Sequence, residues 1–169
     1  MTGILSSKII DSPVGALTLV AEEDALVAIL WEDDAPGRVP LSPLADAPDH
    51  PVLVEAERQL REYFAGARRE FDLPLRFRGT EFQRAVWNVL LTIPFGETWS
   101  YGAIARSLGR PGASRAVGAA NGRNPISIVA PCHRVIGSNG ALTGFAGGLA
   151  AKQALLALER GADLFSSAA

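Results

Sequence analysis

The sequence has very few of the side chains that bind metals or form disulfide bonds. Its 169 residues include one cysteine, Cys132, and two histidines, His50 and His133. A lone cysteine excludes an internal disulfide and suits a reducing compartment, so we expect a cytoplasmic protein. Too few soft ligands are present for a structural zinc site, and no glycine-rich phosphate motif of the GxxxxGK type occurs. We therefore expect neither a bound metal nor a cofactor.

Long apolar runs and the pattern of a secretory signal are also lacking. Apolar residues make up 48% of the chain, which is enough for a buried core, but no run approaches the length of a membrane-spanning helix. No basic region followed by an apolar stretch occurs at the N-terminus. We expect a globular protein without a membrane partner, built from one large domain or two small ones.

Acidic residues are missing from one long segment. Residues 1–97 carry nine basic and 16 acidic side chains, whereas residues 98–158 carry six basic side chains and no acidic one. A phosphate backbone is the natural partner of such a basic segment. The alternative is chance clustering on a solvated face.

Turn signals and hydrophobic periodicity predict an α+β N-terminal part with an antiparallel sheet. The turn at residues 11–15 joins two strands within residues 8–20. The elements expected after this hairpin are a strand at 25–31, a long surface loop at 32–51, an amphipathic helix at 52–65 and a strand at 70–77. No catalytic constellation is recognisable in this part, so we expect it to support the rest of the chain.

The following part is predicted to be mostly helical. A capping box at Thr80-Glu81-Phe82-Gln83 opens a helix that runs to about Thr92. Two short helices follow. The first, at residues 101–108, can be capped by Ser100, and the second, at 113–120, is ended by Asn121-Gly122. Joined by a glycine-containing turn, they match a helix-turn-helix. The second helix is rich in small residues, which allows either a close approach to DNA or tight packing against a neighbour.

The single cysteine follows an apolar run. Residues 126–130 predict a buried strand, and Pro131 marks an edge, a bulge or a sharp turn at its end. A free thiol has a pKa of about 8.5 and needs help to ionise near neutral pH. His133 and Arg134 are the nearest sources of such help. Without its neighbours, a lone cysteine is more often a small buried hydrophobe than a nucleophile.

The stretch Pro131-Cys132-His133-Arg134-Val135 resembles the acceptor motif of the O6-alkylguanine-DNA alkyltransferases, also called methylated-DNA–protein-cysteine methyltransferases. Asn124-Pro125 precedes it at the family's spacing, and Gly147-Gly148-Leu149 and Glu159 follow it. The resemblance is clear over residues 79–160, about half of the chain. It implies irreversible transfer of an alkyl group from O6-alkylguanine in DNA to Cys132, once per molecule, after the base is flipped out of the duplex.

The fold class expected is α+β. A small N-terminal α+β supporting domain is expected at residues 1–78, and a DNA-binding and alkyl-acceptor domain with a winged-helix-like helix-turn-helix at 79–169. We expect a monomer in solution. Its partner is double-stranded DNA containing alkylated guanine, bound through the minor groove mainly by backbone contacts. Neither cooperative binding on DNA nor repair of O4-alkylthymine is decided by the sequence.

The resemblance also implies roles for individual residues. In the catalytic set, Cys132 is the alkyl acceptor, His133 is its base and Glu159 orients that base. Asn124 braces the cysteine loop, and Tyr101 donates a hydrogen bond from its hydroxyl to the flipped base. The DNA-binding set is Ser114, Arg115, Ala116, Arg123 and Arg134, with Arg115 filling the hole in the base stack. A phosphate contact is the alternative for Arg115, and a place in the core is the alternative for Tyr101.

The predicted alkyl pocket is lined by Tyr101, Leu142, Phe145, Ala146 and Gly147. Ala146 stands where some relatives carry serine, and Phe145 where tyrosine is common. We therefore expect backbone amides of Ala146 or Gly147 to replace the missing hydroxyl contacts.

Two other functions remain open from the sequence. The first is a helix-turn-helix module that binds alkylated DNA without repairing it, but relatives of that type lack the acceptor cysteine. The second is a cysteine hydrolase that uses Cys132, His133 and Glu159, against which the DNA-facing motif argues.

Overall fold

The computed structural model describes residues 4–140 and 144–161. Its elements in chain order are β1 (Leu5–Ile10), β2 (Leu17–Glu22), β3 (Ala25–Trp31), β4 (Leu44–Asp46), α1 (Pro51–Phe64), α2 (Glu81–Leu90), β5 (Trp99–Ser100), α3 (Tyr101–Ser107), α4 (Ser114–Gly122), a single 3-10 turn η1 (Cys132–Arg134), β6 (Val135–Ile136) and α5 (Leu149–Glu159). None of these helices is long and apolar enough to cross a membrane. The fold is α+β, as the sequence predicts.

The N-terminal sheet has the strand order β3-β2-β1-β4. The predicted hairpin is present, because β1 pairs antiparallel with β2, and β3 extends the sheet antiparallel to β2. The predicted loop at 32–51 is not wholly irregular, since it contains the short strand β4, which pairs parallel with β1. Helix α1 begins where the His50 side chain accepts a hydrogen bond from Val52 N. Its apolar face, with Leu53, Ala56 and Leu60, is fully buried.

The prediction of a strand at residues 70–77 is wrong. Only one bridge forms there, between Leu26 and Leu75. It is held by Leu26 N donating to Pro74 O (2.8 Å) and Arg76 N donating to Leu26 O (3.0 Å). Pro74 has no N–H to contribute to a ladder, so the pairing does not extend.

The C-terminal helices begin where the sequence predicts. Thr80 and Gln83 form the capping box of α2, and the Ser100 hydroxyl caps α3 by accepting from Ala103 N. Helix α4 runs past the predicted stop, through Asn121 and Gly122. The side chain of Asn121 is buried and bonded to the segment after the helix, which favours a helical Asn121 over a stop at this residue.

The strand predicted at residues 126–130 is also wrong, although the segment is buried. It forms a compact turn, in which Ala130 N donates to Ile126 O (2.9 Å) and Val129 N donates to Ser127 O (2.8 Å). Ile128 has a φ of +74°, which is rare for a β-branched residue and holds only where the surroundings enforce it. A single parallel bridge from Ile126 to Ile29 anchors this turn to the sheet.

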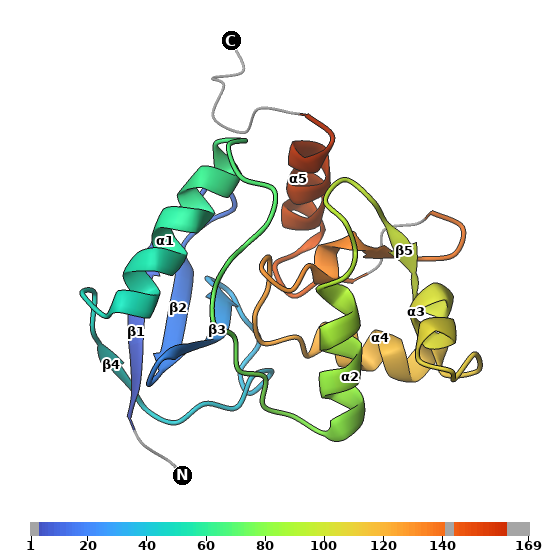
Figure 1. Cartoon of the computed structure of the whole chain (residues 1–169), viewed down its shortest axis with the longest axis horizontal. Helices are drawn as coiled ribbons and strands as arrows, with labels where there is room; N and C mark the ends of the chain where they lie inside the picture. The colour runs from blue at the N-terminus through green and yellow to red at the C-terminus, as the bar shows by residue number, and fades with distance from the viewer. Residues whose placement is uncertain (1–3, 141–143, 162–169) are drawn as a thin grey trace.

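Figure 1 shows the sheet and α1 on one side of the molecule, and α2, α3 and α4 on the other. Helix α5 and the segment that carries Cys132 lie between them. Buried side chains of α5, among them Leu155 and Leu158, share a core with the sheet and α1. Cys132 belongs to a second core, with Val86, Ile104 and residues of the other C-terminal helices. Cys132 therefore lies where the chain passes from the first core, which contains Val129, into the second.

Candidate acceptor site

Cys132 opens the η1 turn directly after Pro131 and is only 3% exposed. Its position is fixed by Asn124, whose side-chain amide donates to Ala130 O (2.8 Å) and accepts from Ile126 N (3.1 Å). Asn121, in the last turn of α4, donates to the carbonyl of Cys132 itself (3.4 Å). The end of α4 is thus bonded directly to the turn that presents the sulfur.

The thiol of Cys132 is neutral at rest. Burial raises its pKa, while hydrogen bonds from Asn124 and Ser127 and the positive charges of Arg38 and Lys152 act in the opposite direction. The thiolate is the nucleophilic form of cysteine. Reaction at this sulfur therefore requires a base that removes the proton at the moment of attack.

His133 is the titratable side chain next to the thiol, and it is fully buried. Its Nε2 lies 2.7 Å from Glu159 Oε2. Burial lowers the pKa of His133, and Glu159 opposes this effect, so the imidazole is neutral near pH 7. A carboxylate only accepts hydrogen bonds, so Nε2 must carry the imidazole proton. Nδ1 is then an unprotonated acceptor, and it has no hydrogen-bond partner among the described residues.

Glu159 is ionised despite its burial. Burial opposes ionisation, but hydrogen bonds from His133 and Arg134, together with the positive charge of Arg134, outweigh it and hold the pKa of Glu159 well below its usual value. The carboxylate therefore fixes the orientation and tautomer of His133, as the third member of a nucleophile–base–carboxylate relay does.

The burial and the hydrogen bonds of Arg134 contradict the prediction that this residue contacts DNA. The residue is 6% exposed, and its Nε and Nη2 donate to Glu159 Oε1 (2.8 Å) and Oε2 (3.0 Å). Its Nη1 donates to Ile93 O (2.6 Å). A guanidinium with three buried hydrogen bonds is committed to the protein interior and cannot also reach a phosphate.

The other predicted DNA-binding residues lie on or just after α4. Arg115, Ala116 and Arg123 are exposed, and Ser114 is half-buried at the start of the helix. Tyr101, at the start of α3, is half-buried and faces α4, because a Cβ added at Gly118 would lie 3.8 Å from its ring.

The predicted pocket loop packs against the end of β3. The Phe145 ring meets Trp31 edge to face at 5.4 Å, and a Cβ on Gly147 would lie 2.6 Å from the Trp31 indole, so only glycine fits there. Phe145, Ala146 and Gly147 are half-buried. Leu142 lies outside the described residues, so the far wall of the pocket stays a prediction.

Three residues near the site were not singled out from the sequence. The Tyr63 hydroxyl donates to Glu159 Oε2 (2.6 Å), and Lys152 Nζ donates to Val135 O (2.7 Å). Arg38 Nη1 donates to the carbonyls of Asn124 (2.8 Å) and Gly122 (3.2 Å), and so ties a loop of the N-terminal part to the end of α4. The hydrogen-bond partner of each of these three residues is distant in the sequence, so no local sequence pattern indicates the contact.

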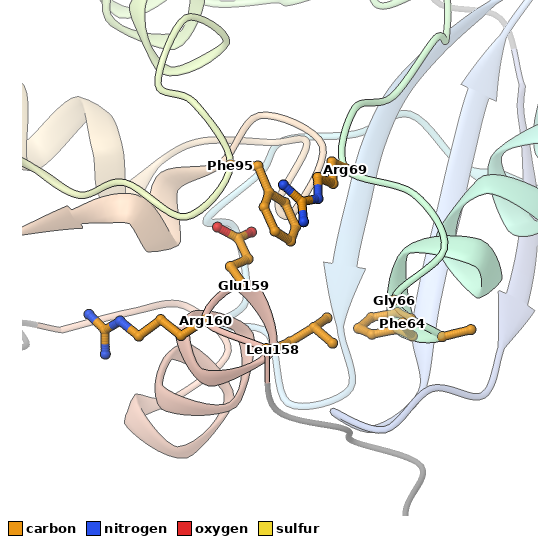
Figure 2. Close-up of a pocket in the computed structure, with 9 residues that line it drawn as sticks. Phe64, Gly66, Arg69, Phe95, Leu158, Glu159 and Arg160 are labelled. Carbon is orange, nitrogen blue, oxygen red and sulfur yellow. The ribbon is translucent and has the colours of Figure 1, made fainter.

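The outer side of Glu159 borders a cavity of about 520 Å³ between the ends of α1 and α5. Figure 2 shows the Glu159 carboxylate beside Phe95, with Arg69 along that ring and Arg160 pointing away. The lining contains neither Cys132 nor any predicted pocket residue. This cavity is therefore not the alkyl site.

The fold and the site together define a protein in which a buried cysteine, followed directly by a histidine that is paired with a buried glutamate, is hydrogen-bonded to the end of an exposed helix of small residues. Comparison with known proteins agrees with this description. The family described as "6-O-methylguanine DNA methyltransferase, DNA binding domain" matches residues 81–161, and "6-O-methylguanine DNA methyltransferase, ribonuclease-like domain" matches residues 5–77.

Individual relatives match along almost the whole chain. The methylated-DNA–protein-cysteine methyltransferase of Mycolicibacterium paratuberculosis is 51% identical over 160 residues, which cover 93% of each protein. That of Methanosarcina acetivorans is 49% identical over 152 residues, covering 89% of this chain and 96% of its own. The crystal structure of Mycobacterium tuberculosis OGT in complex with DNA matches with a TM-score of 0.82 and 50% identity, covering 92% of each chain. This chain belongs to the 6-O-methylguanine DNA methyltransferase family.

Proposed function

We propose that this protein repairs DNA by transferring the alkyl group of O6-alkylguanine to the sulfur of Cys132. The observation that carries the proposal is the buried His133–Glu159 pair directly after Cys132, in a turn that is hydrogen-bonded to the end of the exposed helix α4. A buried cysteine without such a partner would be inert.

Proton transfer begins at His133. Its Nδ1 accepts the thiol proton, directly or through one water molecule, while Glu159 stabilises the imidazolium that forms. The thiolate attacks the alkyl carbon, forming the S–C bond as the C–O6 bond breaks. The guanine leaves as an anion that accepts a hydrogen bond from the Tyr101 hydroxyl, and it takes up the proton that His133 had received, directly or through water, so that the imidazole is neutral again. The products are S-alkylcysteine and guanine in DNA, and the charges balance.

The reacting carbon is unreachable inside a duplex, so the base must be flipped out. Helix α4 exposes small residues such as Ala116 and Ala119, which suit close approach in the minor groove. Arg115 is exposed on the same helix and fills the vacated place in the stack. Contacts to the DNA backbone, together with an extruded base, allow recognition of damage in any sequence.

Intact-mass spectrometry after incubation with duplex DNA containing O6-methylguanine tests the proposal. We expect the mass of one methyl group on the wild-type protein and none on Cys132→Ala, with damaged-DNA binding retained by the variant. A wild-type protein that binds the lesion but gains no mass would instead be a binding module. A Cys132→Ala protein that still removed the lesion would refute the role of the cysteine.

The same experiment with excess DNA separates an acceptor from a hydrolase. A thioether is not cleaved by water under mild conditions, whereas the thioester of a cysteine hydrolase is. Cys132 is the only cysteine in the chain, so no second thiol can receive the group. We expect one lesion removed per molecule at most. Turnover beyond one lesion, or of a small ester substrate, would contradict the proposal.

A further inference from the structure

The last turn of α1 supplies a side chain to the relay from the opposite part of the chain. The Tyr63 hydroxyl donates to Glu159 Oε2 at 2.6 Å, across 96 residues of sequence. Both side chains are buried, and Tyr63 is completely so. Its ring is held by tilted or edge-on contacts with Phe64 (5.4 Å), Phe71 (5.3 Å) and Phe95 (6.3 Å). The hydroxyl is therefore aimed at the carboxylate by rigid aromatic packing.

The oxygen that receives Tyr63 is the one that binds the catalytic base. Glu159 Oε2 lies 2.6 Å from the Tyr63 hydroxyl, 2.7 Å from His133 Nε2 and 3.0 Å from Arg134 Nη2. The other oxygen accepts from Arg134 Nε at 2.8 Å and from Gly96 N at 3.3 Å. A carboxylate offers about four lone-pair sites. Five donors therefore share it, and three of them compete for Oε2.

We infer that Tyr63 is a positioning residue that sets the basicity of His133 through this shared oxygen. A carboxylate that gives electron density to a tyrosine hydroxyl has less to give to the imidazole N–H. Because the site is buried, such competition is not screened by solvent. Tyr63 thus weakens the pull of Glu159 on His133 and keeps the neutral imidazole, with its Nδ1 lone pair, ready to take the thiol proton. This inference rests on the proposed function only where it refers to alkyl transfer.

The N-terminal part is then more than a support for the acceptor domain. The sequence predicts no catalytic residue in it, yet α1 contributes the residue that tunes the relay. Removing the hydroxyl should strengthen the bond from His133 Nε2 to Glu159 and raise the pKa of the imidazole. The acid limb of the alkyl-transfer rate profile should move to higher pH by the same amount.

Nitrogen-15 NMR of the histidine side chains measures this directly. The chain has only two histidines, and His50 lies at the start of α1, away from the relay, so it serves as an internal reference. In the wild-type protein we expect His133 as the Nε2–H tautomer. In Tyr63→Phe we expect its Nε2 proton to shift downfield and its titration midpoint to rise, with His50 unchanged.

A matched control comes from the same helix. Gln59 is buried one turn before Tyr63 and bonds to the backbone of Asp72 (2.8 and 2.9 Å), not to Glu159. Gln59→Met therefore removes buried hydrogen bonds from α1 without touching the relay. We expect it to lower the melting temperature and to leave both the His133 resonances and the pH profile of transfer unchanged.

Fluorotyrosine placed at position 63 tests the opposite direction without removing the hydroxyl. Its phenol is the stronger donor, so the His133 Nε2 proton should shift upfield, which serves as the decisive readout if Tyr63→Phe does not fold. Unchanged His133 resonances in both Tyr63 variants would overturn the inference and leave Tyr63 as a packing residue. Failure of the wild-type protein to accept a methyl group would instead refute the proposed function, while the NMR result would stand.

Discussion

Helix α4 and the η1 turn lie close together in the sequence and carry charge of the same sign, but they use it in opposite ways. Arg115 and Arg123 on and after α4 are exposed, and no ion pair is found for either of them in the described part of the chain. Arg134 in η1 is buried and bound to Glu159. The two regions meet through the hydrogen bond from Asn121 to the Cys132 carbonyl.

In the proposed function, this difference separates recognition from chemistry. An exposed arginine keeps its hydration until a phosphate or a base stack replaces it, so it can serve a partner. A buried arginine is stable only while its carboxylate is present, so it serves the fold and the charge of the relay. Substitutions in the two regions should accordingly affect different measurements.

The largest effect is expected for Arg134→Met. Breaking a buried ion pair from one side typically costs about 3–5 kcal/mol, because the other charge is left uncompensated. We expect a loss of unfolding free energy of this size in urea titrations, and loss of alkyl transfer as Glu159 reorients. Arg115→Met carries the same substitution on α4 and should unfold like the wild-type protein. Equal stability of the two variants would break the comparison.

Alkylation of Cys132 should destabilise the buried region alone. Added methylenes in a packed site typically cost about 1–3 kcal/mol, and Cys132 is 3% exposed. We expect a lower melting temperature for the alkylated protein in calorimetry, and a larger drop for a larger alkyl group. Ala119→Leu adds bulk to the exposed face of α4 and should leave the melting temperature almost unchanged. An unaltered melting temperature after alkylation would show that the site has room to spare.

Arg115→Ala should impair repair without affecting the fold. Its proposed role is to hold the duplex open after base flipping, so single-turnover transfer from duplex DNA should slow by about tenfold, equivalent to about 1.4 kcal/mol. Transfer from free O6-alkylguanine should keep its wild-type rate. Equal slowing on both substrates would place the effect in the site or in the fold instead of the DNA contact.

The last expected effect concerns pH. The pKa of His133 is lowered by burial. As the pH falls, the unfolded chain therefore binds a proton at this residue at a higher pH than the folded protein does. Stability should therefore be complete above the unfolded value of about 6.5 and decrease as pH falls below it, by at most about 1.4 kcal/mol per pH unit from this group. Urea titrations of wild type and His133→Asn between pH 7 and 5 check this expectation. The variant should lose less stability over the interval.

Prediction from the sequence succeeded where the controlling interaction is local. The capping box at Thr80, the cap at Ser100 and the apolar face of α1 all depend on residues within about one helical turn. It failed at residues 70–77 and 126–130, where apolar content indicated strands. Pro74 prevents a longer ladder in the first, and in the second Asn124 Oδ1 takes the N–H of Ile126 that a strand partner would have used.

The sequence by itself determined the family and predicted the acceptor and its neighbouring base, because these are carried by a short contiguous motif and a single cysteine. Tertiary structure decided the rest of the relay. It buried Arg134 and paired it with Glu159, and it brought Tyr63 to the same carboxylate from 96 residues away. The physical reason is burial. A charged side chain inside the protein needs a partner, and the fold brings that partner from any position in the chain, so the sequence separation of two residues does not predict their pairing.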